Sequence, residues 1–464
     1  KKFKKYRDGE IGVMIPTSSG CILTVIGILM AGKVPVMINY STGAEDNCKY
    51  AQSKCGFRTI ITSRALLERI NCPVVPGMVC LEDIMKGISL KDKLGAALRS
   101  KYPAAALIAR MPHKKPDDNL VILFTSGSEK DPKAVQLTHR NLSSNINDLV
   151  EAFHLKEDGV VMSILPLFHI FGFNANFCMP LMVGCTSVTY ANPLDYKRIP
   201  KLIREERATL IAATPVFFSG YLKNSEPGDF ATIDIALPGA DKMPDWLRQG
   251  YRDKHNIELC EAYGTTETSP GISVNTPYDN RPGSIGKPLR GVSVKIVDLD
   301  TGQSLPPGQE GKILVKGDLV MKGYLNDLEE TSLRIVDGWY DTGDMGLFDE
   351  DGYLWFCGRK KQIIVHDGSN IFPQEVEDAL LEHPAVDNVA VIGVHDLLHG
   401  EIVRAYVALR EGAAPVSSSE LIAFARERIG YKAPEEIVFL DEIPLNPTGK
   451  VDRVALKKQA SAHH

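Results

Sequence analysis

The first third of the chain alternates short apolar runs with longer amphipathic segments. Apolar runs occupy residues 11–16 (IGVMIP), 34–40 (VPVMINY) and 59–63 (TIITS), and an amphipathic stretch, EDNCKYAQSKCG, fills residues 45–56. Short apolar runs bounded by turn residues predict buried strands, whereas a 3.6-residue apolar period predicts helices. Strands and helices that alternate in this way are typical of repeated βαβ units, and they predict an α/β fold with parallel sheets.

The longest apolar run near the start, CILTVIGILMAG at residues 21–32, needs a separate interpretation. It is only about half of the roughly 20 residues that a bilayer-spanning helix requires. The preceding IPTSSG provides hydroxyl side chains suited to capping a helix N-terminus. We therefore predict a buried helix packed on a sheet.

The α/β alternation continues to about residue 282, where β-rich pieces separated by turns replace it. We expect a large N-terminal domain over residues 1–358, with a β-rich subdomain at about 283–358 and a front that begins abruptly, as a cut edge does. Residues 359–464 contain amphipathic helices and apolar strands after a charged GRKK segment. They predict a small, compact α+β domain joined by a charged hinge.

Composition excludes several classes of function. The chain is 44% hydrophobic and 24% charged with a net charge of -5, so no global charge favours nucleic acid or an anionic membrane surface as a partner, although local basic clusters could. Its nine cysteines include no CxxC pair. They predict reduced, partly buried thiols in a cytoplasmic compartment, and they argue against a zinc site.

Candidate chemistry first appears at residues 121–135, which read VILFTSGSEKDPKAV. Small and hydroxyl residues directly after an apolar strand let backbone N–H groups converge, and Lys130 and Lys133 add positive charge. The pattern fits a phosphate-binding loop, but it also fits a plain surface turn. The Walker A spacing is absent from the sequence, which argues against an ordinary P-loop NTPase.

Further segments resolve this choice. They are TSGSEKDPKAV (125–135), EAYGTTE (261–267), WYDTGDMGLFDEDGYLWFCGRKKQII (339–364), HDGSNIFPQEVE (366–377) and IPLNPTGKVDR (443–453). Together, and in this order, they resemble the motifs of the adenylate-forming superfamily of acyl-CoA synthetases, acyl-carrier-protein synthetases, adenylation domains and luciferases. The resemblance implies a ligase that uses ATP and Mg²⁺ in two steps. A carboxylate first attacks the α-phosphate of ATP to give an acyl-adenylate, and a thiol then takes the acyl group.

The resemblance also implies roles for the residues that meet the phosphates. The loop residues Thr125, Ser126, Gly127, Ser128 and Lys133 would wrap the β- and γ-phosphates. Thr266 would touch the α-phosphate. Glu267 would bind Mg²⁺, a hard cation that prefers carboxylate and phosphate oxygen.

The nucleoside would be bound by a second set of residues. Tyr263 would stack on adenine and Glu261 would face its exocyclic amine. Small residues at Gly239 and Ala240 would allow close approach beside adenine and the acyl tunnel. Asp344 would accept both ribose hydroxyls, and the forked cation of Arg359 suits ribose and phosphate oxygens.

The remaining implied roles concern the acyl group and the change between half-reactions. Lys450 would reach between the carboxylate and the α-phosphate during adenylation, and Lys361 would be the hinge of the small domain. After rotation, Gly368 would line a tunnel for the thiol. His169 lies where the family places an aromatic gate beside the acyl pocket, although a packed core histidine is the alternative.

A looser resemblance concerns the substrate. MINYSTGAEDN (37–47), CLEDIMKGISLKDKL (80–94) and Ser128-Glu129 look most like the synthetase part of bacterial bifunctional acyl-acyl-carrier-protein synthetase/2-acylglycerophosphoethanolamine acyltransferases. This implies a medium- or long-chain fatty acid, acyl carrier protein as the thiol acceptor, and a location at the inner face of the bacterial inner membrane. An upstream acyltransferase domain would be absent from this chain. A fatty acyl-CoA synthetase and a non-catalytic adenylate-binding module remain as alternatives.

Overall fold

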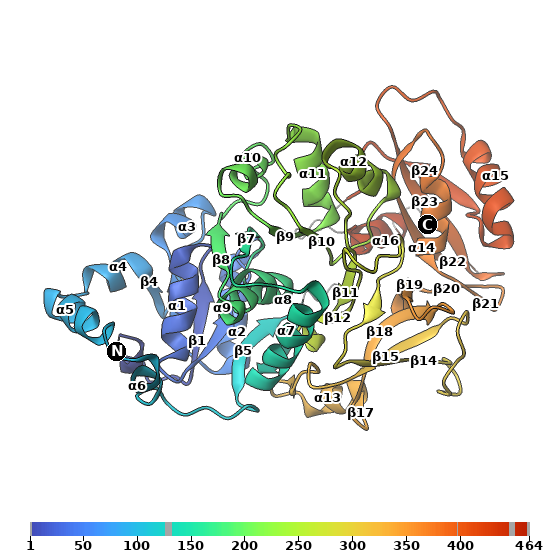
Figure 1. Ribbon diagram of the computed structural model, residues 1–464. Coiled ribbons are helices and arrows are strands. Elements are labelled where there is room, and N and C mark those ends of the chain that lie inside the picture. The colour runs from blue at the N-terminus through green and yellow to red at the C-terminus, as the bar shows by residue number, and fades with distance from the viewer. Residues whose placement is uncertain (1, 126–131, 397, 445–450, 462–464) are drawn as a thin grey trace. The chain divides into compact units, whose positions relative to one another are not determined.

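The computed structural model describes residues 2–125, 132–396, 398–444 and 451–461 (Figure 1). By compactness the chain divides into two units, Lys1–Ser293 with Val315–Tyr340, and Val294–Leu314 with Asp341–His464. We predict a domain boundary at residue 359 because the small domain would rotate about a hinge there. A division by compactness does not detect rotation, so this boundary stays a prediction.

The first unit contains a seven-stranded sheet in the order β16-β6-β5-β2-β1-β3-β4. Its strands are β1 (Glu10–Met14), β2 (Val34–Met37), β3 (Ile60–Thr62), β4 (Met78–Cys80), β5 (Asn119–Phe124), β6 (Ala134–Thr138) and β16 (Gly323–Tyr324). Strands β1 to β5 pair in parallel, and β6 pairs antiparallel with both β5 and β16. The predicted parallel βαβ pattern is confirmed here, because the apolar runs at residues 11–16, 34–40 and 59–63 become the buried strands β1, β2 and β3.

Helices follow the strands of this sheet in the sequence. They are α1 (Ser19–Leu29), α2 (Ala44–Cys55), α3 (Arg64–Arg69), α4 (Leu81–Lys86), α5 (Leu90–Arg99), α6 (Ala104–Ile108) and α7 (His139–Phe153). Helix α1 begins as predicted, because the Ser18 side chain accepts a hydrogen bond from the Cys21 backbone N–H at 3.3 Å. Helices α1 and α2 pack on β1, and α7 packs on β6.

A second, all-parallel sheet of the first unit has the order β10-β9-β7-β8. Its strands are β7 (Val160–Ser163), β8 (Thr186–Thr189), β9 (Leu210–Ala213) and β10 (Ile235–Pro238). The helices between and after them are α8 (Ile170–Phe173), α9 (Met179–Val183), α10 (Arg198–Glu205), α11 (Pro215–Asn224) and α12 (Asp245–His255), and a π-helical turn, η2 (Asn174–Cys178), joins α8 to α9.

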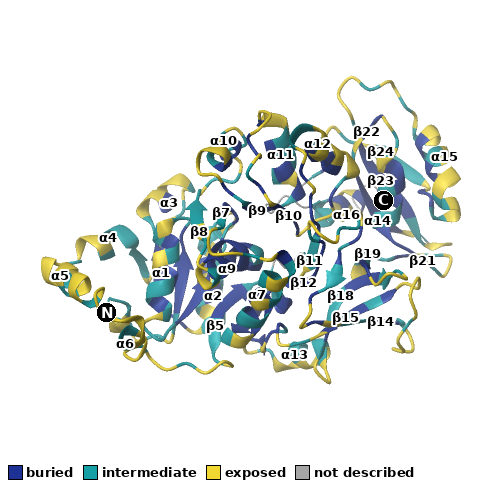
Figure 2. Cartoon of the chain, viewed as in Figure 1, coloured by how far each residue is buried: buried dark blue, intermediate teal, exposed yellow. Residues whose placement is uncertain are grey.

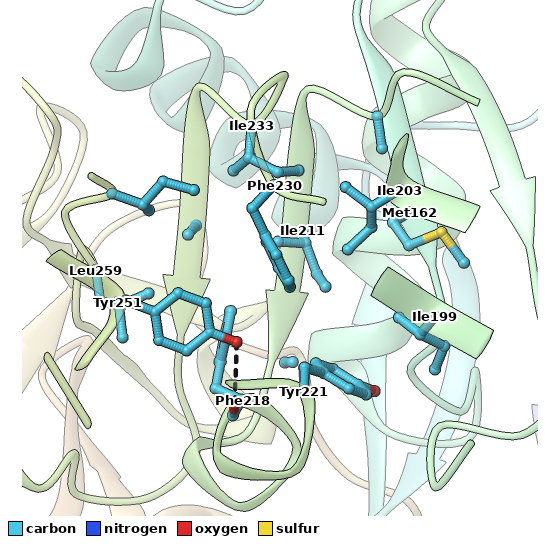
Figure 3. Close-up of a cluster of buried hydrophobic side chains, with 14 of the residues drawn as sticks. Met162, Ile199, Ile203, Ile211, Phe218, Tyr221, Phe230, Ile233, Tyr251 and Leu259 are labelled. Atoms are coloured by element: carbon cyan, nitrogen blue, oxygen red, sulfur yellow. Dashed lines mark hydrogen bonds between the residues drawn. The ribbon is translucent and has the colours of Figure 1, made fainter. Parts of the chain in front are cut away.

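Large apolar side chains fill the space between this sheet and its helices (Figure 3). Phe218, Tyr221, Phe230 and Tyr251 are fully buried. The polar end of Tyr251 is satisfied, because its hydroxyl donates a hydrogen bond to the Phe218 carbonyl at 2.9 Å. The sheet therefore has a tightly buried apolar core.

The rest of the first unit supplies loops and short strands. An antiparallel sheet consists of β11 (Ala262–Gly264), β12 (Gly271–Val274) and β13 (Lys287–Pro288), with the 3₁₀ turn η3 (Thr266–Thr268) between the first two strands. Helix α13 (Leu328–Arg334) leads into β17 (Ile335–Val336), which pairs with the start of β18 (Trp339–Phe348).

The second unit has two β-sheet regions. In the first, β14 (Ser293–Val297), β15 (Gly311–Lys316) and β18 follow one another, and β19 (Leu354–Arg359) pairs with β18. In the second, the order is β21 (Ser369–Ile371), β20 (Ile364–His366), β23 (Gly400–Leu409) and β22 (Val386–Asp396), with β24 (Glu436–Phe439) parallel to β23. The helices are α14 (Pro373–Leu381), α15 (Ser418–Ile429) and α16 (Arg453–Ser461), and the 3₁₀ turns are η4 (Lys360–Gln362) and η5 (Gly430–Lys432).

The predicted fold class, α/β with a β-rich part and an α+β C-terminal part, is confirmed. The strands of both units are mostly buried and the outer helix faces are exposed (Figure 2). All nine cysteines are free thiols, as we predicted. Among the described residues, no helix has the length and apolar character needed to cross a bilayer.

Candidate active site

The base of the predicted phosphate loop is closed by two hydrogen bonds. The Thr125 backbone N–H donates to the Lys133 carbonyl at 3.0 Å, and the Lys133 N–H donates to the Thr125 hydroxyl at 3.1 Å. The Tyr50 hydroxyl adds a bond to the Pro132 carbonyl at 2.8 Å. The loop therefore leaves and re-enters the sheet between β5 and β6 at one fixed point. Ser126, Gly127 and Ser128 lie outside the described residues.

Lys133 is held beside two residues from a distant part of the chain. Its ammonium forms an ion pair with Glu330 and lies 5.0 Å from the ring centroid of Tyr324. Arg334 bonds the same Glu330 carboxylate oxygen at 3.0 Å. Burial alone would raise the pKa of Glu330. The hydrogen bonds from Lys133 and Arg334 have the larger combined effect, so the pKa of Glu330 is lowered. Glu330 thus stays ionised and positions Lys133.

Tyr324 connects this lysine to the predicted Mg²⁺ ligand. Its hydroxyl donates a hydrogen bond to Glu267 Oε1 at 2.9 Å. Burial raises the pKa of Tyr324, and the neighbouring Glu267 raises it further, so the phenol remains a donor at neutral pH. The Glu267 backbone carbonyl accepts a hydrogen bond from the Met321 N–H at 2.8 Å. Glu267 is 8% exposed. Tyr324 therefore lies between Lys133 and Glu267 and contacts both side chains. Thr266 lies one residue before Glu267, in η3.

Glu261 forms a buried ion pair. Its Oε2 atom accepts from Arg248 Nη2 at 2.7 Å and from the Gly283 N–H at 3.2 Å, and the two side chains are 10% and 7% exposed. Burial raises the pKa of Glu261, and Arg248 opposes that shift. This carboxylate oxygen therefore has a structural partner. The predicted contact of Glu261 with adenine stays a prediction.

Gly239 follows the carboxyl end of β10, where ligands bind in sheets of this kind. A Cβ atom on Gly239 would lie 3.1 Å from Phe171 Cε1, and its next neighbour would be the Ala262 carbonyl. Ala240 adopts a left-handed φ of 70°, an unusual conformation for a non-glycine residue. The loop is thus packed between α8 and the strand that carries Tyr263. His169 precedes α8, and its ring lies 4.7 Å from that of Phe168.

In the second unit, Asp344 and Arg359 lie directly opposite each other on the antiparallel strands β18 and β19. Arg359 Nε is 3.4 Å from Asp344 Oδ1. Asp344 is 6% exposed, whereas Arg359 is exposed. A buried carboxylate beside an exposed guanidinium forms a paired acceptor and donor suited to a sugar phosphate.

The residues implied in the second half-reaction lie further along this unit. Lys361 is exposed in η4. Gly368 and Asp367 have φ values of 74° and 49°, so they form the two-residue turn of the β20–β21 hairpin with both residues left-handed. Lys450 lies outside the described residues.

The sequence did not identify Tyr324, Glu330 or Arg248. Their partners are 57, 197 and 13 positions away in the chain. A tyrosine or glutamate in an ordinary segment carries no local signal for such pairing.

Comparisons with known proteins give the class of this chain. Residues 4–325 match the model of the family described as AMP-binding enzyme, and residues 375–450 match that of the AMP-binding enzyme C-terminal domain. The chain is 31% identical to the long-chain-fatty-acid--CoA ligase of Bacillus subtilis (strain 168), covering 98% of this chain and 86% of that protein.

Solved structures agree with this assignment. ATP-bound MatB from Rhodopseudomonas palustris is 26% identical with a TM-score of 0.86, covering 98% of this chain and 90% of that one. The o-succinylbenzoate coenzyme A synthetase (MenE) from Bacillus subtilis, solved with ATP and a magnesium ion, is 26% identical with a TM-score of 0.80, covering 97% and 89%.

The fold and these matches define an adenylate-forming acid–thiol ligase. The chain belongs to the AMP-binding enzyme family. Like the family, it uses ATP and Mg²⁺. The side chains fit these groups, because Glu267 offers a buried carboxylate oxygen and Lys133 a positioned ammonium. The predictions of ligase class, ATP and Mg²⁺ are confirmed, whereas the individual site residues stay predictions.

Proposed function

We propose that this ligase activates a medium- or long-chain fatty acid as its acyl-adenylate and transfers the acyl group to the phosphopantetheine thiol of acyl carrier protein. The observation that carries the fatty-acid part is the similarity to a long-chain-fatty-acid--CoA ligase over almost the whole chain. The carrier-protein part rests on residues 37–47, 80–94 and Ser128-Glu129.

In adenylation, a carboxylate oxygen of the fatty acid bonds to the α-phosphorus while the bond from that phosphorus to the bridging oxygen breaks. Pyrophosphate leaves with the electron pair. Lys133, positioned by Glu330, would neutralise charge on the leaving group, and Glu267 would hold the Mg²⁺ that supplies Lewis-acid stabilisation. No general base is required, because a carboxylate is already ionised at neutral pH.

In the second step, the thiol sulfur bonds to the acyl carbon, the bond from that carbon to the phosphate oxygen breaks with its electron pair staying on AMP, and the thiol proton is released to solvent. Carrier proteins are acidic, and exposed Lys360 and Lys361 in η4 would favour such a partner. Arg428 contributes less to such a surface, since it is paired with Glu382 at 2.7 Å. Coenzyme A is the second candidate acceptor, and the name of the Bacillus subtilis relative favours it.

A competition assay separates the two acceptors. The enzyme is incubated with ATP, Mg²⁺ and a panel of fatty acids, and equal amounts of holo acyl carrier protein and CoA compete in a single turnover. We expect acyl carrier protein to be the main product. Acyl-CoA as the main product would reject carrier-protein transfer and keep adenylation, and no adenylate from any acid would favour a binding module.

Within that assay we expect Lys450→Ala to lower the adenylation rate by about 100-fold or more, as loss of a transition-state cation does. Lys458→Ala, an exposed lysine of α16, is the matched control and should change the rate by less than about twofold. Equal rates for the two variants would remove Lys450 from the reaction.

We propose further that the enzyme acts in the cytoplasm at the inner face of the membrane and docks there through helix α5. Leu90, Leu94 and Leu98 lie on one face of α5 and are 72%, 59% and 66% exposed. No residue of α5 is buried. The basic side chains on this helix are Lys91, Lys93 and Arg99. Exposed leucines beside lysine and arginine suit the interface of an anionic bilayer.

Vesicle sedimentation tests this docking. We expect the enzyme to pellet with vesicles containing phosphatidylglycerol, and Leu94→Glu to reduce the bound fraction at least about threefold, since a carboxylate must leave the interface. Leu333→Glu on α13, at a leucine 67% exposed, is the control. Equal pelleting of the two variants would reject α5 as the docking element, and a dimer that dissociates in Leu94→Glu would assign the face to a second copy.

A further inference from the structure

Two turns of the second unit bring a pair of histidines and an aspartate together. Asp367 lies in the β20–β21 turn, and His399 lies just before β23. The Asp367 backbone N–H donates to the His399 carbonyl at 3.0 Å, and His366 pairs with Gly400 in the sheet. The positions of these side chains are therefore set by backbone pairing rather than by side-chain contacts alone.

The tautomer of His366 follows from its partner. Its Nδ1 atom lies 2.8 Å from the Glu401 carbonyl oxygen, which can only accept, so Nδ1 carries the hydrogen. In the neutral ring, the Nε2 lone pair then points away from that bond. Nε2 lies 3.5 Å from Asp367 Oδ2 and 3.3 Å from Glu435 Oε1, both of them acceptors. A metal ion placed there would accept the Nε2 lone pair and face both carboxylates.

His399 completes the group on its other side. Its Nδ1 atom lies 2.9 Å from Asp367 Oδ1, and its ring stacks on that of His366 with centroids 5.2 Å apart. One ligand atom from each of His366, Asp367 and His399 falls within 4.8 Å of the others. The His366 side chain is 13% exposed, whereas Asp367 and His399 are open to solvent, so an ion could enter.

The ligand atoms lie close enough to converge on one ion after small side-chain movements. With Zn–N and Zn–O distances near 2.0–2.1 Å, neighbouring ligand atoms of a tetrahedron lie about 3.3 Å apart. Imidazole nitrogens suit zinc, cobalt and nickel better than magnesium or calcium. The bond from His366 Nδ1–H to a backbone carbonyl is also the support that metal-binding histidines commonly have.

We propose that His366, Asp367 and His399 form a binding site for a divalent transition metal of the zinc class, with Glu435 or water in the fourth position. The sequence does not reveal this site, because its cysteines lack metal spacing and the two histidines are 33 positions apart. Glu435 is oriented for the role, since its Oε2 accepts from the Val403 N–H at 2.5 Å while Oε1 faces His366.

The position of the site suggests its effect. Bound metal would fasten the Asp367-Gly368 turn to the turn that carries His399. This consequence rests on the proposed function, in which Gly368 lines the path of the thiol. Metal would then slow acyl transfer while leaving adenylation unchanged, because Asp367 and His399 flank Gly368 and neither has a role in the proposed adenylation step.

Cobalt(II) titration tests binding without any activity measurement. All proteins carry His463→Ala and His464→Ala, because adjacent histidines can bind metal independently. We expect one equivalent of Co²⁺ to give a tetrahedral absorption spectrum that Zn²⁺ displaces. His399→Ala should weaken binding at least about tenfold, whereas His113→Ala, an exposed histidine elsewhere, should not change it. No spectrum, or equal binding by both variants, would overturn the site.

A second measurement tests whether bound metal slows acyl transfer. Adenylation and acyl transfer are followed separately with and without one equivalent of Zn²⁺, in the parent and in His399→Ala. We expect slower transfer in the parent alone, with unchanged adenylation. Binding with unaffected transfer would leave the metal site standing and overturn its link to Gly368. Failure to form adenylate at all would reject the proposed function and not the metal site.

Discussion

Glu267→Gln is expected to lower the rate of adenylation by about 100- to 1,000-fold at ordinary Mg²⁺ concentrations. The substitution keeps the size of the side chain and an oxygen that accepts from the Tyr324 hydroxyl, which lies 2.9 Å from Glu267 Oε1. It removes the negative charge with which a hard cation is bound. The loss should therefore appear in the chemistry rather than in folding, with a change in unfolding free energy of less than about 1 kcal/mol.

Pyrophosphate release in a single turnover, measured over a range of Mg²⁺ concentrations, checks this result. Part of the lost rate should return as Mg²⁺ is raised, because the variant binds the ion more weakly. Glu330→Gln is the matched control, since Glu330 contacts Lys133 and not the proposed metal position. We expect it to lose about tenfold with no dependence on Mg²⁺. A Glu267→Gln enzyme within fivefold of the parent would exclude Glu267 as the Mg²⁺ ligand.

The sequence predicted the site motifs and the elements that carry them, because both are local. Apolar runs such as residues 11–16 became β1, and the hydroxyl residues before residue 21 capped α1. Signals of this kind depend on neighbours a few positions apart. They are readable without knowledge of the rest of the fold.

What the sequence did not predict depends on distant partners. Glu330 reaches Lys133 across 197 positions, and Tyr324 reaches Glu267 across 57. The compact units also exchange segments, because residues 294–314 and 341–358 group with the C-terminal part. Such pairings are set by how sheets pack, which no periodicity in the chain encodes.

Arg248→Ala is expected to reduce the free energy of unfolding by about 3–5 kcal/mol at pH 8, because it leaves the buried Glu261 carboxylate without its charge partner. Arg252→Ala is the matched control on the same helix. Arg252 pairs with Glu258, but both side chains are more than 40% exposed, so we expect a loss of less than about 1 kcal/mol. Denaturant unfolding followed by tryptophan fluorescence measures both.

The pH dependence of this loss identifies its cause. Burial raises the pKa of Glu261 in the folded protein, and Arg248 is the first of the groups that oppose the shift. Without Arg248 the folded pKa rises further above the unfolded one, so protonation favours the folded state. The penalty is then largest above the folded pKa and shrinks as pH falls toward the unfolded pKa. We expect a smaller loss at pH 5.5 than at pH 8.

Removing both buried charges together should restore part of the free energy of unfolding. The double variant Arg248→Met/Glu261→Gln removes both charges while keeping similar volumes, and it should recover at least about half of the loss at pH 8. A loss for Arg248→Ala that is independent of pH, and that the double variant does not recover, would mean that Arg248 acts through packing of its alkyl chain. The charge of Arg248 would then contribute little to stability, and the Glu261 carboxylate would keep the Gly283 N–H as its structural partner.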